Sequence, residues 1–173
     1  MKMKKILILA LAVVMAGSLA ACGMGDVGGA TSSASNASSQ TVSSAVGSDN
    51  MEDNLAGLEK YLAANSAISG TSTVMKADFI GAKSGAKYVF AYNGKNNVTV
   101  ELYEFDTENL SSQATSILNE VKAKNQFNLM NQDVPAVVSD SGKYIMIYKD
   151  TATSDENKKH QEEVTNLFKA FKK

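Results

Sequence analysis

The chain has 173 residues and a formal net charge of −1, and all 17 of its basic residues are lysines. Without arginine it lacks the bidentate contacts to guanine and phosphate on which nucleic-acid recognition relies, so we expect no nucleic-acid partner. It also lacks tryptophan, the largest stacking platform for sugars, although six tyrosines remain.

The N-terminal segment has the parts of an export signal. Three lysines among residues 2–5 precede 16 uncharged residues, which run into Leu19-Ala20-Ala21-Cys22 and the chain's single cysteine. The apolar stretch is shorter than the roughly 20 residues of a membrane-spanning helix. An ordinary secretory signal cut after Ala20 is the alternative, because Ser18 and Ala20 are small residues at the positions such cleavage prefers.

The four residues ending in Cys22 resemble the lipobox of bacterial lipoproteins at every position. The resemblance implies that residues 1–21 are a signal peptide, removed before Cys22, and that the Cys22 thiol carries a diacylglycerol. It therefore implies a protein held by lipid on the cell membrane and facing outside the cytoplasm. Two or more acyl chains hold a protein stably on a membrane, whereas a single chain does so only marginally.

The segment after the cysteine reads as a linker. Residues 23–48 are almost entirely Gly, Ser, Ala, Thr, Asn and Val, and Asp26 is their only charged residue. Such a composition buries too little apolar surface to offset the entropy of ordering, so we expect residues 22–48 to be a disordered tether. Residues 49–173 then form one domain of ordinary size.

The first predicted element of the domain is an amphipathic helix. Its apolar residues recur at helical spacing, and a cap at Asp49 or Asn50 is expected to begin it: Met51, Leu55, Leu58 and Leu62. Asn65 and Ser66 are expected to end it. The next segment, residues 75–82, suits a short helix, although Gly81 and Gly85 interrupt it.

A β-hairpin follows, with strands over residues 88–92 and 98–105 around Asn93-Gly94. Asn-Gly between β-rich runs is a strong hairpin signal, because both residues tolerate positive φ. A two-residue turn pairs Val89 with Val98, and a four-residue turn pairs Val89 with Val100. Both registers place Val89, Val98 and Val100 on one aliphatic face, because side chains alternate along a strand.

The rest of the chain predicts helix, hairpin, helix. Residues 110–121 carry a helical apolar stripe with a cap at Asp106 or Asn109, residues 136–138 and 144–148 form the second hairpin, and a final helix begins at Thr153 or Ser154. The predicted fold class is therefore α+β, with a four-stranded, mostly antiparallel sheet built from two hairpins in a ββαββα-like order, flanked by N- and C-terminal helices.

Two groups of residues are candidate metal ligands. Glu156 and the only histidine, His160, are four residues apart on one helical face, although two ligands without a third are a weak signal. Glu104, Asp106 and Glu108 alternate at a strand end and would suit Ca²⁺ or Mg²⁺. The simpler interpretations are a solvated charged helix face for the first group and helix capping for the second.

The predicted sheet also gives a candidate binding surface. Opposite the aliphatic face, alternation gathers five of the six tyrosines: Tyr88, Tyr92, Tyr103, Tyr144 and Tyr148. An exposed aromatic patch on a soluble domain is typical of a binding surface. The alternatives are that a helix or residues 75–82 cover this face, or that the tyrosines are simply good strand residues.

These observations predict a lipid-anchored, extracytoplasmic module that binds a protein or cell-envelope partner without catalysis, and they identify no catalytic residue and no cofactor. The alternative is a small lipoprotein that senses a metal or ligand or captures a solute, although 125 residues are too few for the two lobes of a typical solute-binding protein. A hydrolase acting on cell-wall material is the third interpretation.

Overall fold

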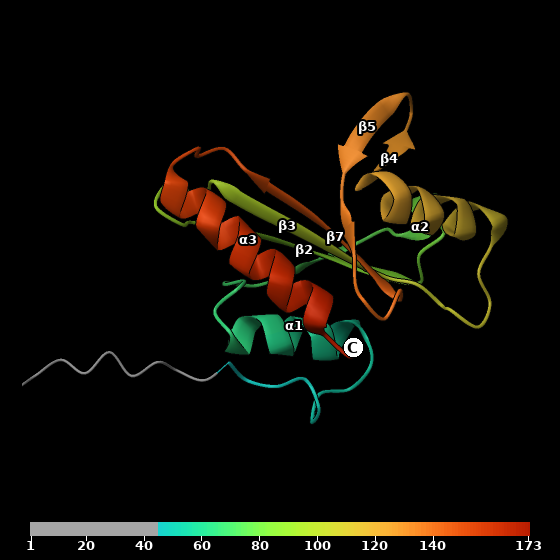
Figure 1. Ribbon diagram of the computed structural model, residues 1–173, viewed down its shortest axis with the longest axis horizontal. Helices are drawn as coiled ribbons and strands as arrows, with labels where there is room; N and C mark the ends of the chain where they lie inside the picture. The colour runs from blue at the N-terminus through green and yellow to red at the C-terminus, as the bar shows by residue number, and fades with distance from the viewer. Residues whose placement is uncertain (1–44) are drawn as a thin grey trace, which may run out of the picture. The chain divides into compact units, whose positions relative to one another are not determined.

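The computed structural model describes residues 45–173 (Figure 1). The predicted signal peptide, Cys22 and most of the predicted linker lie outside these residues. Among the described residues, no helix combines the length and apolar character needed to cross a membrane. The elements are α1 (Leu55–Ala64), β1 (Thr73–Met75), η1 (Asp78–Ile80), β2 (Ser84–Phe90), β3 (Val98–Glu104), α2 (Ser112–Lys124), β4 (Gln126–Leu129), β5 (Gln132–Pro135), β6 (Val137–Val138), β7 (Tyr144–Asp150) and α3 (Asp155–Ala170).

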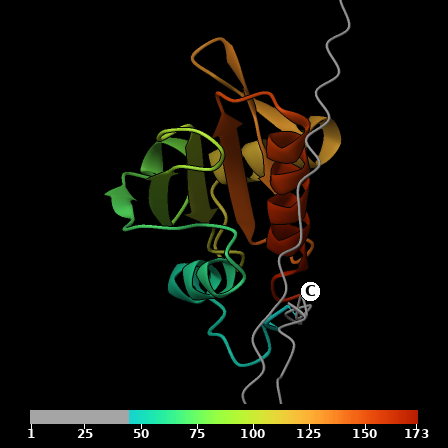
Figure 2. The same cartoon turned by 90° about the vertical axis from the view of Figure 1, so that its left-hand side faces the viewer.

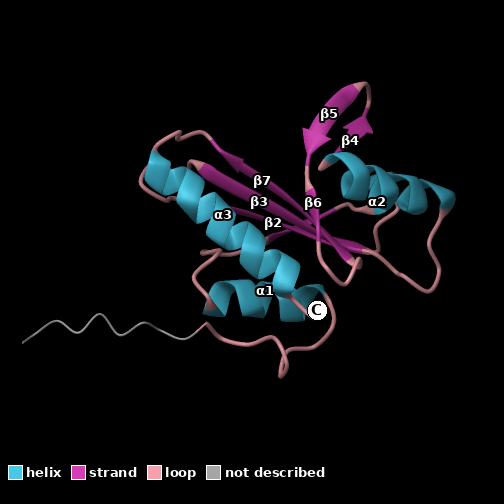
Figure 3. Ribbon diagram, in the orientation of Figure 1, coloured by secondary structure: helices cyan, strands magenta, loops and turns pink. Residues whose placement is uncertain are grey.

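The main sheet has the order β1-β2-β3-β7-β6, and every neighbouring pair in it is antiparallel (Figure 3). Strands β4 and β5 form a separate two-stranded sheet. The predicted α+β class and antiparallel sheet are confirmed, and the two predicted hairpins supply β2, β3, β6 and β7. The prediction missed β1 as the fifth strand and the β4–β5 hairpin.

Helices pack against both faces of the main sheet. One buried cluster joins α1 and α3 to the sheet, with Leu58, Leu62, Val164 and Phe168 facing Val98, Val100 and Leu102. A second cluster joins α2, η1 and β4 to the other face, through Ile80, Ile117, Val121, Phe127 and Ile145. Helices α1 and α3 meet at the C-terminal end of the chain, where the Phe171 and Tyr61 rings are 5.3 Å apart (Figures 1 and 2).

The register of the first hairpin differs from both predicted registers by one residue. Phe90 pairs with Val98 and Tyr88 with Val100, whereas Val89 pairs with Thr99. A shift of one residue moves every side chain to the other face of a strand. Val89 is therefore half exposed on the face opposite Val100, and the prediction that both valines point inward is wrong.

The shift arises because residues 91–97 form a seven-residue loop in place of a tight Asn-Gly turn. The Asn97 carboxamide accepts a hydrogen bond from the Tyr92 backbone N–H (3.0 Å) and donates to the Tyr92 carbonyl (2.8 Å). It also donates to Asp150 at 2.7 Å. Positive φ occurs at Asn93 and Asn96, but not at Gly94. One buried asparagine side chain thus replaces the backbone turn.

Several helix starts also differ from the predictions. Helix α1 is capped by Asn54, whose side chain accepts from the Gly57 N–H, and α2 is capped by Ser111. Both caps lie later in the chain than the predicted ones, which were Asp49 or Asn50 for α1 and Asp106 or Asn109 for α2. The predicted cap at Ser154 is confirmed for α3. Residues 73–82 form a short strand and one 3₁₀ turn, not a continuous helix.

Candidate binding groove

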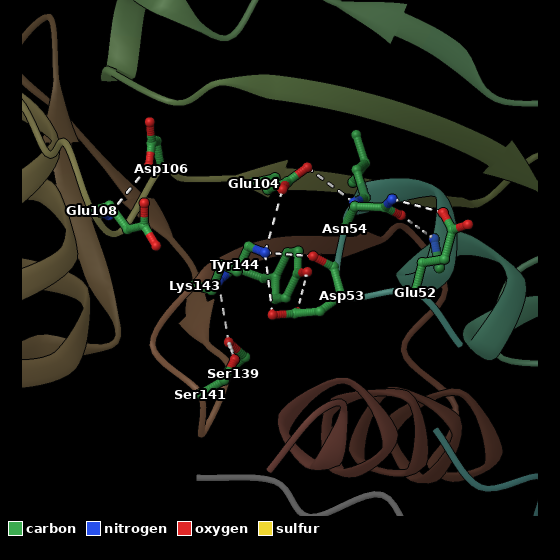
Figure 4. Close-up of polar contacts among 12 residues, drawn as sticks. Glu52, Asp53, Asn54, Glu104, Asp106, Glu108, Ser139, Ser141, Lys143 and Tyr144 are labelled. Carbon is green, nitrogen blue, oxygen red and sulfur yellow. Dashed lines mark hydrogen bonds and ion pairs between the residues drawn. The ribbon is translucent and has the colours of Figure 1, made fainter. Parts of the chain in front are cut away.

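Glu104 stands at the centre of a polar cluster that fastens the start of α1 to the sheet (Figure 4). Its buried carboxylate accepts hydrogen bonds from the Leu55 N–H (3.0 Å) and the Ser84 hydroxyl (3.2 Å). Lys143 lies 3.6 Å from the same carboxylate and 3.2 Å from that of Asp53. We call Asp53, Glu104, Lys143 and Tyr144 the Glu104 cluster.

Asp53 completes the cluster from the α1 side. Tyr144 donates its hydroxyl proton to Asp53 at 2.7 Å, and Lys143 also donates to the Asp53 carbonyl. Desolvation acts to raise the pKa of Asp53, but the hydrogen bonds from Tyr144 and Lys143 outweigh it and lower that pKa. Burial and the adjacent Asp53 raise the pKa of Tyr144. Tyr144 therefore stays a proton donor, and the cluster acts as a structural fastening.

The carboxylates beside this cluster line a polar cavity of about 310 Å³. Asp106 accepts from the Glu108 N–H (3.2 Å) and the Asn109 side chain (3.2 Å), so it organises the loop before α2. Hydrogen bonding to Asn109 lowers the pKa of Asp106 despite a small desolvation effect. Asp106 thus caps a loop, not the helix, while the Glu104 carboxylate is already paired with lysine and backbone donors.

His160 lies in the core and not on a solvated helix face. Its ring stacks on Tyr92 with centroids 3.7 Å apart, and its Nδ1 lies 2.9 Å from the Tyr148 hydroxyl. Burial lowers the pKa of His160, although Glu163 and Asp150 act in the opposite direction. Burial, with smaller effects from Asp150 and Tyr92, raises the pKa of Tyr148 to about 12.

The proposed Glu156–His160 metal pair is not formed. Glu156 is exposed on α3, whereas His160 is buried and engaged by Tyr148. Within residues 45–173, no three His, Cys, Asp or Glu side chains are grouped to hold a metal ion. The helical spacing predicted a shared face, but Asn157 and His160 are the residues of this turn that face inward.

The predicted exposed tyrosine surface is wrong in its geometry. Tyr103 is buried on the α2 side of the sheet, while the other strand tyrosines are buried under α1 and α3: Tyr88, Tyr144 and Tyr148. The one-residue register shift turns Tyr88 inward together with Val100, and Tyr148 pairs with Val100 on the same face. Of the five, only Tyr92 is partly exposed, and it lies beyond the end of β2.

A groove runs between the C-terminal end of α1 and the middle of α3. It consists of two adjoining hollows of about 490 and 240 Å³ that share Asn65, Ser66, Glu163 and Leu167. Ala45, Val46, Ala64 and Asn166 complete the larger hollow, and Ala67, Tyr92, His160 and Val164 complete the smaller one. We call these residues the α1–α3 groove.

The N-terminal segment of the described chain, around Val46, forms one wall of this groove. The Val46 N–H donates to the Asn65 side-chain oxygen (2.8 Å), and the Asn65 amide donates to the Val46 carbonyl (3.0 Å). The same amide donates to the Tyr61 carbonyl (2.9 Å), which fixes the Asn65 side chain on the end of α1. These contacts, with a hydrogen bond from the Lys172 N–H to the Ser48 hydroxyl (3.2 Å), extend into the segment predicted as linker.

Sequence reasoning identified Asn65 only as a helix end and left Glu163 and Asn166 unremarked. The available signal was on α3, where these two polar residues flank the apolar stripe at Val164 and Leu167. That pattern marks the edge of a packed helix, but the partner helix and the returning N-terminal segment are not visible in it.

No family model, curated protein or solved structure matches the chain.

Proposed function

We propose that this protein is a membrane-tethered, extracytoplasmic lipoprotein that binds a partner in the α1–α3 groove and has no catalytic role. The groove itself carries the proposal. It is the place where exposed polar groups, an aromatic floor and apolar walls converge around a concave surface. That combination is typical of binding sites, in which a few polar groups orient a ligand held mainly by apolar contact.

The packing of the domain supports a binding role over a catalytic one. Among the described residues, every buried side-chain nitrogen and oxygen has a hydrogen-bond partner. The ionisable side chains with perturbed pKa values, such as Asp53 and Tyr144, hold elements together through direct contacts. Structural pairing of this kind accounts for their pKa shifts without a catalytic role.

The tether sets where the binding takes place. Lipid on Cys22 would leave residues 23–44 between the membrane and the described domain. A coil of this length and Gly/Ser-rich composition spans roughly 25 Å on average. Ala45 and Val46, which line the groove, directly follow the proposed tether. A partner bound in the groove would therefore lie close to the membrane surface.

Capture of a small solute in the same groove is the second candidate. The smaller hollow, about 240 Å³, has a polar rim at Glu163 and a stacked floor of Tyr92 and His160. Its size suits a single side chain or a small molecule. A cell-wall hydrolase has the least support, because in the polar cavity beside Glu104 the Asp53 and Glu104 carboxylates are already paired with Lys143.

Two measurements test the proposal. The wild-type protein should enter the detergent phase in a phase-partitioning assay and Cys22→Ala should not, because the thiol is the proposed lipid carrier. A photo-crosslinking amino acid at Asn166, in the groove, should then give a defined adduct in intact cells. The same residue at Val89, half exposed on the far side of the sheet, is the matched control. Equal labelling at both positions, or none at Asn166, would contradict a groove-centred binding role.

A further inference from the structure

We infer that the α1–α3 groove binds an extended peptide segment of a partner protein, with Asn166 facing the peptide backbone and a lysine side chain of the peptide entering the hollow between Tyr92 and Glu163. This inference rests on the proposed binding function and specifies its ligand class. It combines three features of the groove: its fit to extended backbone, its single charge and its aromatic floor.

The fit to peptide backbone is visible in the chain's own N-terminal segment, at Val46. Asn65 pairs with both the N–H and the C=O of Val46, the two groups that an extended residue presents on one side. Asn97 recognises Tyr92 in the same bidentate way. In two places, therefore, an asparagine carboxamide makes the pair of backbone hydrogen bonds that a neighbouring strand would otherwise make.

Asn166 offers a third carboxamide in the groove. It lies one helical turn after Glu163 on α3 and is exposed, and its side chain makes no hydrogen bond to another described residue. A carboxamide carries both donors and an acceptor, so it matches the N–H and C=O of an extended residue. A peptide lying between Val46 and α3 would meet Asn166 on one side and the apolar side chains of Val46 and Leu167 along its length.

Charge complementarity selects a basic side chain. Glu163 is the only acidic side chain lining either hollow. His160, the only other ionisable group there apart from Tyr92, has a lowered pKa and adds no positive charge at neutral pH. Lys159 lies 3.8 Å from Glu163, but both side chains are more than half exposed, so water screens this pair and a ligand can replace it.

The floor of the smaller hollow favours a cation as well. The Tyr92 ring stacks flat on His160, which holds it in place at the end of β2. An ammonium group over a tyrosine face gains attraction from the ring, and the four-carbon stem of lysine packs on apolar walls such as Val164 and Leu167. The hollow therefore accommodates both the ammonium group and the aliphatic stem of a lysine side chain.

Peptide titration of the full mature chain, labelled with nitrogen-15 and held in detergent micelles, tests the inference. The probes are acetyl-Ala-Ala-Lys-Ala-Ala-amide and the same peptide with norleucine in place of lysine. The lysine peptide should shift the Asn166 side-chain signal and the backbone signals of Tyr92 and Glu163. Glu163→Gln should weaken lysine-peptide binding by roughly two- to fivefold, as expected for a partly exposed ion pair, and should leave norleucine-peptide binding unchanged. Glu162→Gln, an adjacent glutamate outside the groove, is the matched control.

The possible failures are distinguishable. Equal binding of the two peptides, or equal effects of Glu163→Gln and Glu162→Gln, would overturn the basic-peptide inference. Deleting residues 24–40 should leave the groove signals of the free protein unchanged, and a change would show that the chain's own linker fills the groove. If Asn166 crosslinks a partner in cells but no peptide shifts the groove signals, the peptide inference fails while the binding function stands.

Discussion

Replacing Glu104 by glutamine removes the charge at the centre of the Glu104 cluster while keeping the shape of the side chain. The glutamine oxygen can still accept from the Leu55 N–H and the Ser84 hydroxyl. The glutamine amide, however, would face the Lys143 ammonium, which now lies 3.6 Å from a carboxylate oxygen. A donor would therefore replace an acceptor beside a partly buried cation.

The magnitude follows from burial. The Glu104 side chain is 5% exposed and that of Lys143 is 20% exposed, so this pair is poorly screened, whereas Lys83 is 63% exposed and contributes little. Removing one partner of a buried pair costs about 3–5 kcal/mol. Because Lys143 keeps Asp53 as a partner, we expect a smaller loss than this, about 2–3 kcal/mol in the free energy of unfolding. This is a large share of the roughly 5–15 kcal/mol that holds a domain folded.

Urea unfolding followed by far-ultraviolet circular dichroism measures this loss. With an m-value of about 1–3 kcal/mol/M, the midpoint should fall by about 0.7–3 M for Glu104→Gln, without a change in m. The matched control is Glu108→Gln, the same chemical change at an exposed position of the following loop. A midpoint within error of the wild type for Glu104→Gln would refute the conclusion that the Glu104 cluster fastens α1 to the sheet.

Two further predictions concern the core. Because the pKa of His160 is lower in the folded chain than its ordinary value near 6.5, the unfolded chain binds more protons as pH falls through 6.5, and stability should decrease there. In His160→Gln, the melting temperature should change less between pH 7.5 and 5.5 than it does in the wild type. An equal slope of melting temperature against pH in the two proteins would contradict this prediction. Val100→Asp should prevent folding or cost more than about 4 kcal/mol, because it buries an unpaired charge. Val89→Asp should leave urea unfolding nearly unchanged, and comparable damage from both substitutions would show that the observed register is wrong.

The sequence was most informative where the signal is local and repeated. The C-terminal helix was predicted from a stripe at Val164, Leu167, Phe168 and Phe171, and all of these are buried except Leu167, which is partly buried. The apolar run at residues 144–148 also marked a strand correctly, and these residues of β7 are buried on both faces of the sheet. Periodicity reports which residues are apolar on one element, and it carries no information about what covers them.

The register of the first hairpin could not be predicted because a distant residue decides it. Asn97 closes the loop by bonding both Tyr92 and Asp150, and Asp150 lies at the end of β7, 53 residues away. The local Asn-Gly pair favoured a tight turn, and the tertiary contacts of Asn97 overrode it. The β4–β5 hairpin was missed for a related reason, since its turn uses positive φ at Met130 and Asn131 without an Asn-Gly pair.

The candidate groove was beyond sequence reasoning for a third reason. Its walls come from the end of α1, the middle of α3 and the segment around Val46, which are far apart in the chain. Each residue has an ordinary local role, such as Asn65 ending a helix. Only their meeting in space makes a concave surface.

The contacts of the N-terminal segment also determine how the domain would respond to tension along its tether. A pulling force enters at Val46 and first meets the two hydrogen bonds to Asn65, then the one between Ser48 and Lys172. These few bonds resist far less than the seven-residue pairings of β3 with its two neighbours. Residues 45–49 would therefore peel away first, each adding about 3.5 Å of reach, while the sheet stays folded. Because Val46 is part of the groove wall, mechanical extension of the tether would change the shape of the groove before the sheet began to unfold.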